Sequence, residues 1–293
     1  MTCRTAEEIP LHQITAGRYT VTALSDGLSR LPALFFPGLQ CCTQASGIDA
    51  DGTIHIPTGC FLVNGADRTV LVDAGLGPLL LPYPEGMPPA TASQGQPTPF
   101  LSEGGQLPDQ LRALGCDPSD IDTVVLTHLH PDHIGWIAPH GIPYFPRAQI
   151  VCGAADWDAL IEASNDAEPG ITGMKTARDA DRLTLIDNAS HDIAPGITME
   201  HAAGHTPGSY ILVIGSARQR AYLLGDVVQH PLQLNDQSIS FLTDADRAQA
   251  ARTRSALLRR LEREHNAIGM AHFPGSDFQR IISGNPRIWK PQH

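Results

Sequence analysis

Apolar residues along this chain alternate with polar ones or cluster in short runs, and both patterns are typical of β-strands. Strands are predicted at residues 19–24, 54–64, 69–73, 123–127, 149–152, 183–187, 197–201, 209–215, 220–225 and 267–271. The first strand should end in a turn at 25–27, and residues 28–52 should be irregular. The chain is therefore predicted to be rich in β-structure.

Apolar residues at helical spacing predict three helices. Leu107, Leu111 and Leu114 share one face of the first, and the second covers 154–164. The third is an amphipathic helix over about 245–264. Its cap is predicted to be Thr243 or Asp244, and its buried side Ala248, Leu257, Leu258 and Leu261.

Strands followed by helices, twice over, predict two β-rich halves with their sheets packed face to face, in one α+β domain over 1–293. Residues 1–18 are interpreted as an N-terminal extension. The segment 77–105 is interpreted as a loop, because it is rich in Pro and Gly and has seven prolines between Pro78 and Pro99. A loop of this length can be a lid, a pocket wall or a surface excursion.

Composition argues against nucleic acid and membranes as partners. The formal net charge is -11 and Lys is limited to Lys175 and Lys290, so no basic stripe can neutralise a phosphate backbone. No apolar run reaches the ~18 residues of a membrane span, and a secretory signal pattern is absent. No C-x-x-C occurs among the six cysteines, which predicts reduced thiols at Cys3, Cys41, Cys42, Cys60, Cys116 and Cys152. A cytoplasmic protein is the simplest interpretation.

The densest cluster of chemically active residues follows the strand predicted at 123–127. Its pattern is H-x-H-x-D-H, formed by His128, His130, Asp132 and His133. Imidazole and carboxylate are the usual ligands of zinc and similar divalent metals, and a buried run of them is costly without a cation. The alternative is a solvated polar turn, which the position after an apolar strand disfavours. The sequence therefore predicts a metal site.

Three further residues follow predicted strands and can complete this site. His205 lies in a glycine-flanked turn, Asp226 follows a glycine at a strand end, and His272 ends the last core strand. Each alone is more typical of a turn or core residue than of a ligand. Together, downstream of H-x-H-x-D-H, they are interpreted as ligands.

Five other residues keep two interpretations each. Asp73, at a strand end, caps a turn or steadies the metal ligands. His230 contacts substrate or orients Asp226, or it is an ordinary loop histidine. The aromatic residues near the motifs either line an apolar pocket or pack in the core. These residues are Trp136, Phe241 and Phe273.

The seven candidate ligands resemble those of the metallo-β-lactamase superfamily of binuclear metallohydrolases, and the similarity covers roughly 54–275 with Val-Asp-Ala-Gly at 72–75. The resemblance implies a four-layer αββα sandwich with the site at one edge between the sheets. It implies two divalent metal ions, most simply zinc. The implied ligands are His128, His130 and His205 for one ion, Asp132, His133 and His272 for the other, and Asp226 between them.

The same resemblance implies a mechanism and narrows the substrate. A hydroxide shared by both metals is the expected nucleophile, and Asp132 is expected to steer it or pass a proton to the leaving group. Asp132 and Asp226 are thus the expected catalytic residues. Because β-lactamases of this superfamily generally lack the bridging carboxylate, Asp226 disfavours antibiotic hydrolysis.

Lactonases of quorum signals and organophosphate or aryl-ester hydrolases keep the bridging carboxylate. Lactonases often carry a Tyr shortly after it, where this chain has Val227-Val228-Gln229-His230 and is more similar to the methyl parathion hydrolase branch. We expect hydrolysis of a small-molecule ester, lactone or phosphotriester. An acyl-homoserine-lactone lactonase, an iron-dependent sulfur dioxygenase and a non-catalytic binder are the alternatives, and a homodimer is left open.

Overall fold

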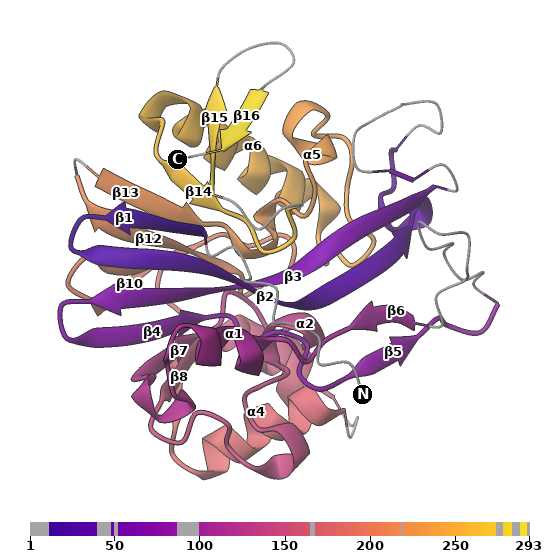
Figure 1. Ribbon diagram of the computed structural model, residues 1–293. Coiled ribbons are helices and arrows are strands. Elements are labelled where there is room, and N and C mark those ends of the chain that lie inside the picture. Colours follow the sequence, from indigo (N-terminus) through magenta and orange to yellow (C-terminus); the bar gives the residue numbers. More distant parts are fainter. Residues whose placement is uncertain are drawn as a thin grey trace, which may run out of the picture.

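The computed structural model describes residues 12–39, 48–49, 52–86, 100–164, 168–217, 219–273, 278–282 and 288–291 (Figure 1). Most of the predicted N-terminal extension, residues 87–99 of the predicted loop, and Cys3, Cys41 and Cys42 lie outside these ranges. Within them, no helix is long and apolar enough to cross a membrane. The described cysteines, Cys60, Cys116 and Cys152, are free thiols.

The first sheet has nine strands, and its order is β5-β6-β2-β3-β4-β7-β8-β9, with β1 paired to β2. The strands are β1 His12–Ala16, β2 Tyr19–Pro32, β3 Thr53–Gly65, β4 Arg68–Val72, β5 Leu80–Pro82, β6 Phe100–Glu103, β7 Thr123–Val125, β8 Gln149–Gly153 and β9 Leu183–Ile186. Neighbours from β4 to β9 along this order are parallel, and the other pairs are antiparallel.

The second sheet has seven strands in sequence order. They are β10 Ser190–Ala194, β11 Ile197–His201, β12 Tyr210–Ser216, β13 Gln219–Leu223, β14 Ala267–Gly269, β15 Gln279–Ile282 and β16 Ile288–Pro291. The pair β13–β14 is parallel, because helix α6 (Arg247–Glu264) crosses between them, and the other neighbours are antiparallel.

Helices cover the outer face of each sheet (Figure 1). On the side of the first sheet these are α1 Leu107–Ala113, α2 Pro131–Ile134, α3 Ala154–Asp156 with a π-helical turn Trp157–Glu162, and α4 Pro169–Asp179. On the side of the second sheet they are α5 Leu232–Asn235 and α6 Arg247–Glu264. Single 3₁₀ turns occur at Ala33–Phe35, Pro118–Asp120, Pro139–Gly141 and Gly225–Val227.

Three of the four clusters of buried apolar residues fill the spaces between four layers. In β3, Cys60 and Leu62 face the helices of the first sheet, whereas Phe61 and Val63 face the second sheet. Both faces are buried here, so residues 60–63 form a continuous apolar run instead of alternating with polar residues. A third cluster joins the second sheet to α6 through Leu258 and its neighbours. The predicted αββα sandwich is confirmed.

The N-terminal third contains more strand than the sequence predicted. The turn expected at 25–27 is a β-bulge between Ser25 and Gly27, so β2 continues to Pro32 through residues expected to be irregular. Part of the expected extension forms β1, and part of the loop 77–105 forms β5 and β6. These short strands pair with one another and with β2, which supplies hydrogen bonds that local sequence cannot reveal.

Other elements also differ from the sequence prediction. Neither helix α4 nor strand β10 was predicted. Helix α6 is capped by Asp246, which accepts a hydrogen bond from Gln249 N, and not by Thr243 or Asp244. Ala248 is exposed, and the buried face of α6 instead holds Ala250, Arg254, Leu257, Leu258 and Leu261. At about 100° per residue, Ala248 lies nearly opposite Ala250 around the helix and therefore faces away from the buried side.

A buried carboxylate organises the loops beneath β2. Asp26 is fully buried, and its oxygens accept hydrogen bonds from the backbone N–H groups of Leu76, Gly77, Gly105 and Leu107. A fifth donor is the indole of Trp136, 2.8 Å away. Burial raises the pKa of Asp26, and these donors oppose that rise by stabilising the anion.

Replacing Asp26 by Ala should lower the free energy of unfolding by about 3 kcal/mol or more, because each buried N–H left without an acceptor costs about 1–3 kcal/mol. Denaturant unfolding of the metal-free protein measures this change. Asp109→Ala is the control, since Asp109 is 70% exposed and pairs only with Arg112 on the surface of α1. Equal stability of the two variants would contradict the organising role.

Candidate metal centre

The strand-end motif presents its four side chains through a sharp change in backbone. Strand β7 ends at Val125, and α2 begins at Pro131 after an extended residue, His130. Pro131 at the first helical position fixes a backbone angle suited to the helix and needs no hydrogen-bond acceptor. His128 and His130 therefore project from the turn, and Asp132 and His133 from the first turn of α2.

The other three candidates reach the same edge from the second sheet. His205 lies between β11 and β12, Asp226 in the 3₁₀ turn after β13, and His272 just after β14. Gly225, with φ of 49°, is required before Asp226, because a Cβ there would lie 2.7 Å from Thr127 Oγ1. The structure thus brings together all seven residues that the sequence singled out.

Three imidazole nitrogens converge in a first cluster. His130 Nδ1 lies 3.1 Å from His128 Nε2 and 2.9 Å from His205 Nε2. Asp226 Oδ2 approaches this cluster, at 3.3 Å from His205 Nε2 and 3.9 Å from His128 Nε2. His128 and His205 are buried, whereas His130 is partly exposed.

A second cluster faces the other oxygen of the same carboxylate. Asp226 Oδ1 lies 3.3 Å from His133 Nε2 and 3.1 Å from His272 Nε2. Asp132 completes the cluster, with Oδ2 at 3.5 Å from His272 Nε2 and Oδ1 at 3.9 Å from His133 Nε2. Asp226 therefore stands between the two clusters, with one oxygen directed at each.

This donor set fits two divalent cations. The ligand atoms of each three-residue group lie within 4.8 Å of one another. His133 Nε2 and Asp226 Oδ1 are buried and have no hydrogen-bond partner, and such atoms are costly unless they bind something. Nitrogen and oxygen donors without thiolates are suited to zinc and similar ions.

Burial and neighbouring charge set the protonation of these groups. Burial lowers the pKa of His128 well below its usual value, and burial together with His205 lowers that of His130 to about 4. Burial alone would raise the pKa of Asp226, but the imidazoles of His272 and His133 bring it well below its usual value. In the second cluster burial alone would lower the pKa values of His133 and His272, but the nearby carboxylates raise both, with Asp73 acting most on His133 and Asp226 most on His272. Because neutral imidazole and ionised carboxylate are the forms that bind metals, a cation there would displace protons.

Asp73 contacts a candidate ligand directly. Its Oδ2 lies 2.9 Å from His133 Nδ1, and its Oδ1 accepts a hydrogen bond from Thr127 N at 2.8 Å. Asp73 has a φ of 61°, an uncommon angle for a residue with a side chain. Of its two sequence interpretations, the structure supports the one in which Asp73 steadies the ligands. The carboxylate close to Nδ1 favours a proton on that nitrogen, which leaves Nε2 to face the cluster.

Two buried carboxylates at the site were not recognised from the sequence. Asp244, predicted only as a possible helix cap, lies 2.9 Å from His205 Nδ1 through Oδ1. Asp156 joins the two histidine-bearing turns, because it accepts hydrogen bonds from Leu129 N, Thr206 Oγ1 and Gly208 N. Neither residue belongs to a motif, so only the fold reveals its position. The imidazole of His272 is oriented by the Pro57 carbonyl oxygen, 2.7 Å from Nδ1.

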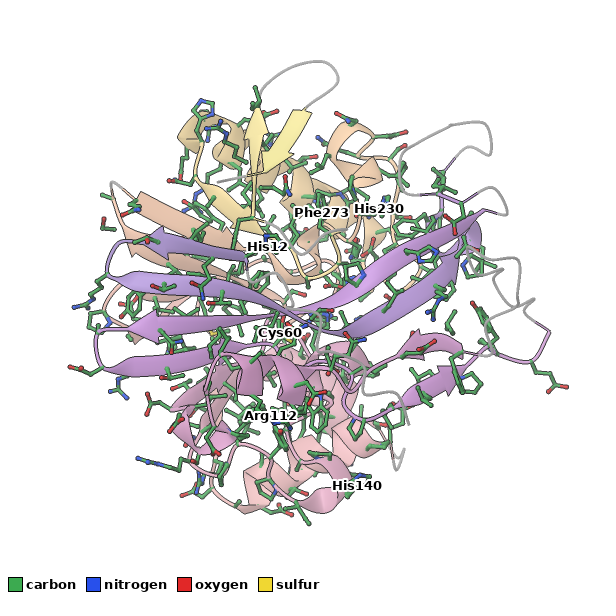
Figure 2. The ribbon with its side chains drawn as sticks, in the orientation of Figure 1. His12, Cys60, Arg112, His140, His230 and Phe273 are labelled. Carbon is green, nitrogen blue, oxygen red and sulfur yellow. The ribbon has the colours of Figure 1, made fainter. Side chains whose placement is uncertain are left out.

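The structure also decides between the two interpretations of His230 and of the three aromatic residues. His230 is buried, its ring lies edge-on to Phe36 at 5.7 Å, and none of its described contacts reaches Asp226. Trp136 and Phe273 pack in core clusters, and Figure 2 shows Phe273 and His230 in the half of the molecule that contains α5 and α6. Phe241 alone among the three aromatic residues lines the cavity beside the site.

This cavity has a volume of about 250 Å³ and reaches four candidate ligands, His130, Asp132, Asp226 and His272. Its apolar walls are Leu31, Phe35, Ile56, Leu76, Leu81, Leu101 and Phe241. Ser29, Ser102 and Thr243 add hydroxyl groups. Among the residues described here, no Lys or Arg lines it. The cavity therefore suits an uncharged, largely apolar molecule.

Residues 56–272 match the model of the metallo-beta-lactamase superfamily, and the chain belongs to this family. It is 32% identical over 180 residues to the N-acyl homoserine lactonase AiiB of Agrobacterium fabrum, a match covering 58% of this chain and 62% of AiiB. A Bacillus N-acyl homoserine lactonase is 25% identical over 194 residues, which cover 65% of this chain and 72% of that protein. The chain thus spans less than two thirds of AiiB.

Two solved structures share the fold over nearly the whole chain. AidC, a dizinc quorum-quenching lactonase, superposes with a TM-score of 0.79 at 21% identity, and the match covers 97% of each chain. The hydrolase AbOPH superposes with a TM-score of 0.78 at 22% identity, also over 97% of each chain. At these identities the likeness establishes the fold.

The environment of His230 predicts a dependence of stability on pH. Burial lowers its pKa to about 4 in the folded protein, against 6.5 when exposed. The unfolded chain therefore binds an extra proton between these values, and stability falls as the pH decreases. Relative to His230→Phe, the wild-type free energy of unfolding should decrease by about 2 kcal/mol between pH 7.5 and pH 5.

Urea unfolding of both metal-free proteins at the two pH values measures this difference. Every other titrating group is shared, so its contribution cancels. Parallel pH dependence in wild type and variant would show that His230 titrates normally in the fold.

Proposed function

We propose that this protein is a binuclear metal-dependent hydrolase that opens a neutral lactone or ester, and that acylated homoserine lactones are its substrate class. The observation that carries the proposal is Asp226, whose two oxygens face separate ligand clusters at the end of an apolar cavity. The similarity to AiiB and to the Bacillus enzyme, both N-acyl homoserine lactonases, supports this substrate class.

The proposed ligands are His128, His130 and His205 for one ion, Asp132, His133 and His272 for the other, and Asp226 for both. Zinc is the proposed metal, because the donors are imidazole and carboxylate and because the structurally similar AidC is a dizinc enzyme. When bound, two such ions supply Lewis-acid chemistry that activates a water and polarises a carbonyl group.

The chain's own groups would orient the reaction and move its proton. Asp73, Asp244 and the Pro57 carbonyl hold three imidazoles at Nδ1, so that each Nε2 faces its cluster. Asp132 lines the cavity and its side chain is 30% exposed, which leaves it accessible to a bound molecule. It is placed to take a proton from the attacking water and give it to the leaving alcohol oxygen.

The cavity favours an uncharged substrate. A carboxylate or phosphate on the substrate would lose its hydration without gaining a cationic partner from the described lining residues. An acyl chain would instead pack against the apolar walls formed by Leu31, Ile56 and Leu101. The net charge of -11 also disfavours polyanionic substrates.

A neutral phosphotriester or aryl ester is the second candidate. The described lining contains no Tyr, and the residues after Asp226 are Val227-Val228-Gln229-His230, so a phenol beside the site is not available to assist lactone opening. The fold shared with AbOPH is compatible with this candidate. A single-iron sulfur dioxygenase is less well supported, because one iron does not require a second ligand cluster. Metal analysis distinguishes these classes.

Purified wild type should bind two zinc ions per chain and hydrolyse acyl homoserine lactones. Asp226→Ala removes the ligand shared by both clusters, so turnover should fall by more than about 100-fold, the upper range for loss of an outer ligand partner. Metal content by elemental analysis and a pH-stat assay of lactone opening give both quantities. Asp109→Ala, on the surface of α1, is the control and should behave as wild type.

Three outcomes of this experiment would contradict the proposal. Full turnover in Asp226→Ala excludes the shared role of this carboxylate. One iron per chain with oxygen consumption on a persulfide supports the dioxygenase. Turnover of a phosphotriester with none on lactones supports the second candidate.

The apolar cavity predicts a preference for longer acyl chains. Each methylene that it buries should raise kcat/KM by up to about fourfold, which corresponds to about 0.8 kcal/mol, until the cavity is full. Leu101→Trp should remove this gain by filling the cavity, and Leu185→Trp, on the exposed side of β9, should not. Kinetics with a homologous series of acyl lactones test this, and an unchanged chain-length profile in Leu101→Trp would place the acyl chain elsewhere.

A further inference from the structure

We propose that Asp244 is a positioning residue that holds one metal ligand, His205, and one wall of the substrate cavity, Phe241, with a single carboxylate. The inference rests on the proposed function, because it takes His205 as a ligand. It adds that the two proposed metal sites depend unequally on Asp244, which is a ligand of neither.

Each oxygen of Asp244 has its own donor. Oδ1 lies 2.9 Å from His205 Nδ1, and Oδ2 accepts a hydrogen bond from Phe241 N at 2.9 Å. The side chain of Asp244 is completely buried, so water cannot replace either contact. The adjoining backbone strengthens the link, because Ala245 N donates to His205 O and Asp246 N donates to Gly204 O.

The contact at His205 fixes its tautomer. When Nε2 offers its lone pair to the cluster, Nδ1 carries the proton and needs an acceptor. Gln229 Nε2 also lies 3.1 Å from Nδ1, but this amide nitrogen is a donor and already donates to Asp226 O at 2.6 Å. Asp244 is therefore the acceptor for His205, and ionised carboxylate is the strongest one available.

The contact at Phe241 fixes the cavity wall. The Phe241 ring lines the cavity and lies 5.1 Å from Phe36 and 6.1 Å from His205, between centroids. Arg254, buried in α6, joins the same region by donating to Val227 O at 3.3 Å and to Ile239 O at 3.0 Å. The positive charge of Arg254 offsets the negative charge of Asp244 in this buried region.

Only one of the two clusters depends on this carboxylate. His205 belongs to the cluster with His128 and His130. In the other cluster, His133 and His272 are oriented by Asp73 and by the Pro57 carbonyl. Loss of Asp244 should therefore weaken one metal site and leave the other unchanged.

Asp244→Asn tests this, because an amide has one acceptor oxygen and cannot serve both donors. In zinc titrations of the metal-free protein against a chromophoric chelator, one site should weaken by about 10–100-fold and the second should keep its affinity. KM for a long-chain acyl lactone should rise, because Asp244 would no longer hold the cavity wall formed by Phe241. Excess zinc should restore kcat but not KM.

Asp246→Asn is the matched control. It makes the same change two residues later, at the N-cap of α6, where Asn caps as well as Asp. Both zinc affinities and KM should equal those of wild type. Asp244→Glu is the second variant, since it keeps both acceptor oxygens but moves them by one methylene, and it should show a smaller loss at the same site.

Four results would overturn the inference. The first is wild-type zinc affinity in both Asp244 variants, and the second is equal weakening of both sites. The third is the appearance of the same effects in Asp246→Asn. The fourth is failure of both Asp244 variants to fold, which would show that Asp244 is needed for the fold itself. Fewer than two zinc ions in wild type is a separate result, because it refutes the proposed function itself.

Discussion

The site depends on buried carboxylates that accept hydrogen bonds from the turns at the ends of the strands. A turn leaves backbone N–H groups without partners in the sheet, and burial makes each unpaired group costly. Asp26, Asp73, Asp156 and Asp244 satisfy such groups at positions far apart in the sequence. Because two of these residues also contact imidazoles, the interactions that close the turns determine the direction of the ligands.

This arrangement places an anionic framework beneath the imidazole clusters. Asp73 and Asp244 lie on the side of His133 and His205 that faces away from the other ligands, and Asp226 lies between the clusters. Negative charge around neutral imidazoles increases their basicity toward a cation. The proposed hydrolase thus gains metal affinity from residues that would not bind the metal. Asp132, the more exposed of the two candidate carboxylate ligands, is open to the cavity.

The sequence predicted the four layers and all seven candidate ligands, because both leave local patterns. Apolar runs identified the central strands, and His or Asp close after a strand identified the candidate ligands. Asp73 was found because it also follows a strand, but two other buried acids could not be found in this way. Asp156 follows β8 without a motif, and Asp244 resembles a helix cap. β5 and β6 were also missed, because short strands form through pairing with β2 and not through their own periodicity.

The extended ends of β2 and β3 have a consequence for how the substrate of the proposed hydrolase can evolve. They project beyond the sandwich beside β5 and β6 (Figure 1) and supply Leu31 and Ile56 to the cavity, and β6 adds Leu101, whereas the candidate ligands come from turns of the central layers. Substitutions on the projecting strands can alter which molecule fits while the ligand turns stay intact. Selection acting on these strands can therefore change the substrate of the proposed hydrolase without altering its candidate ligands.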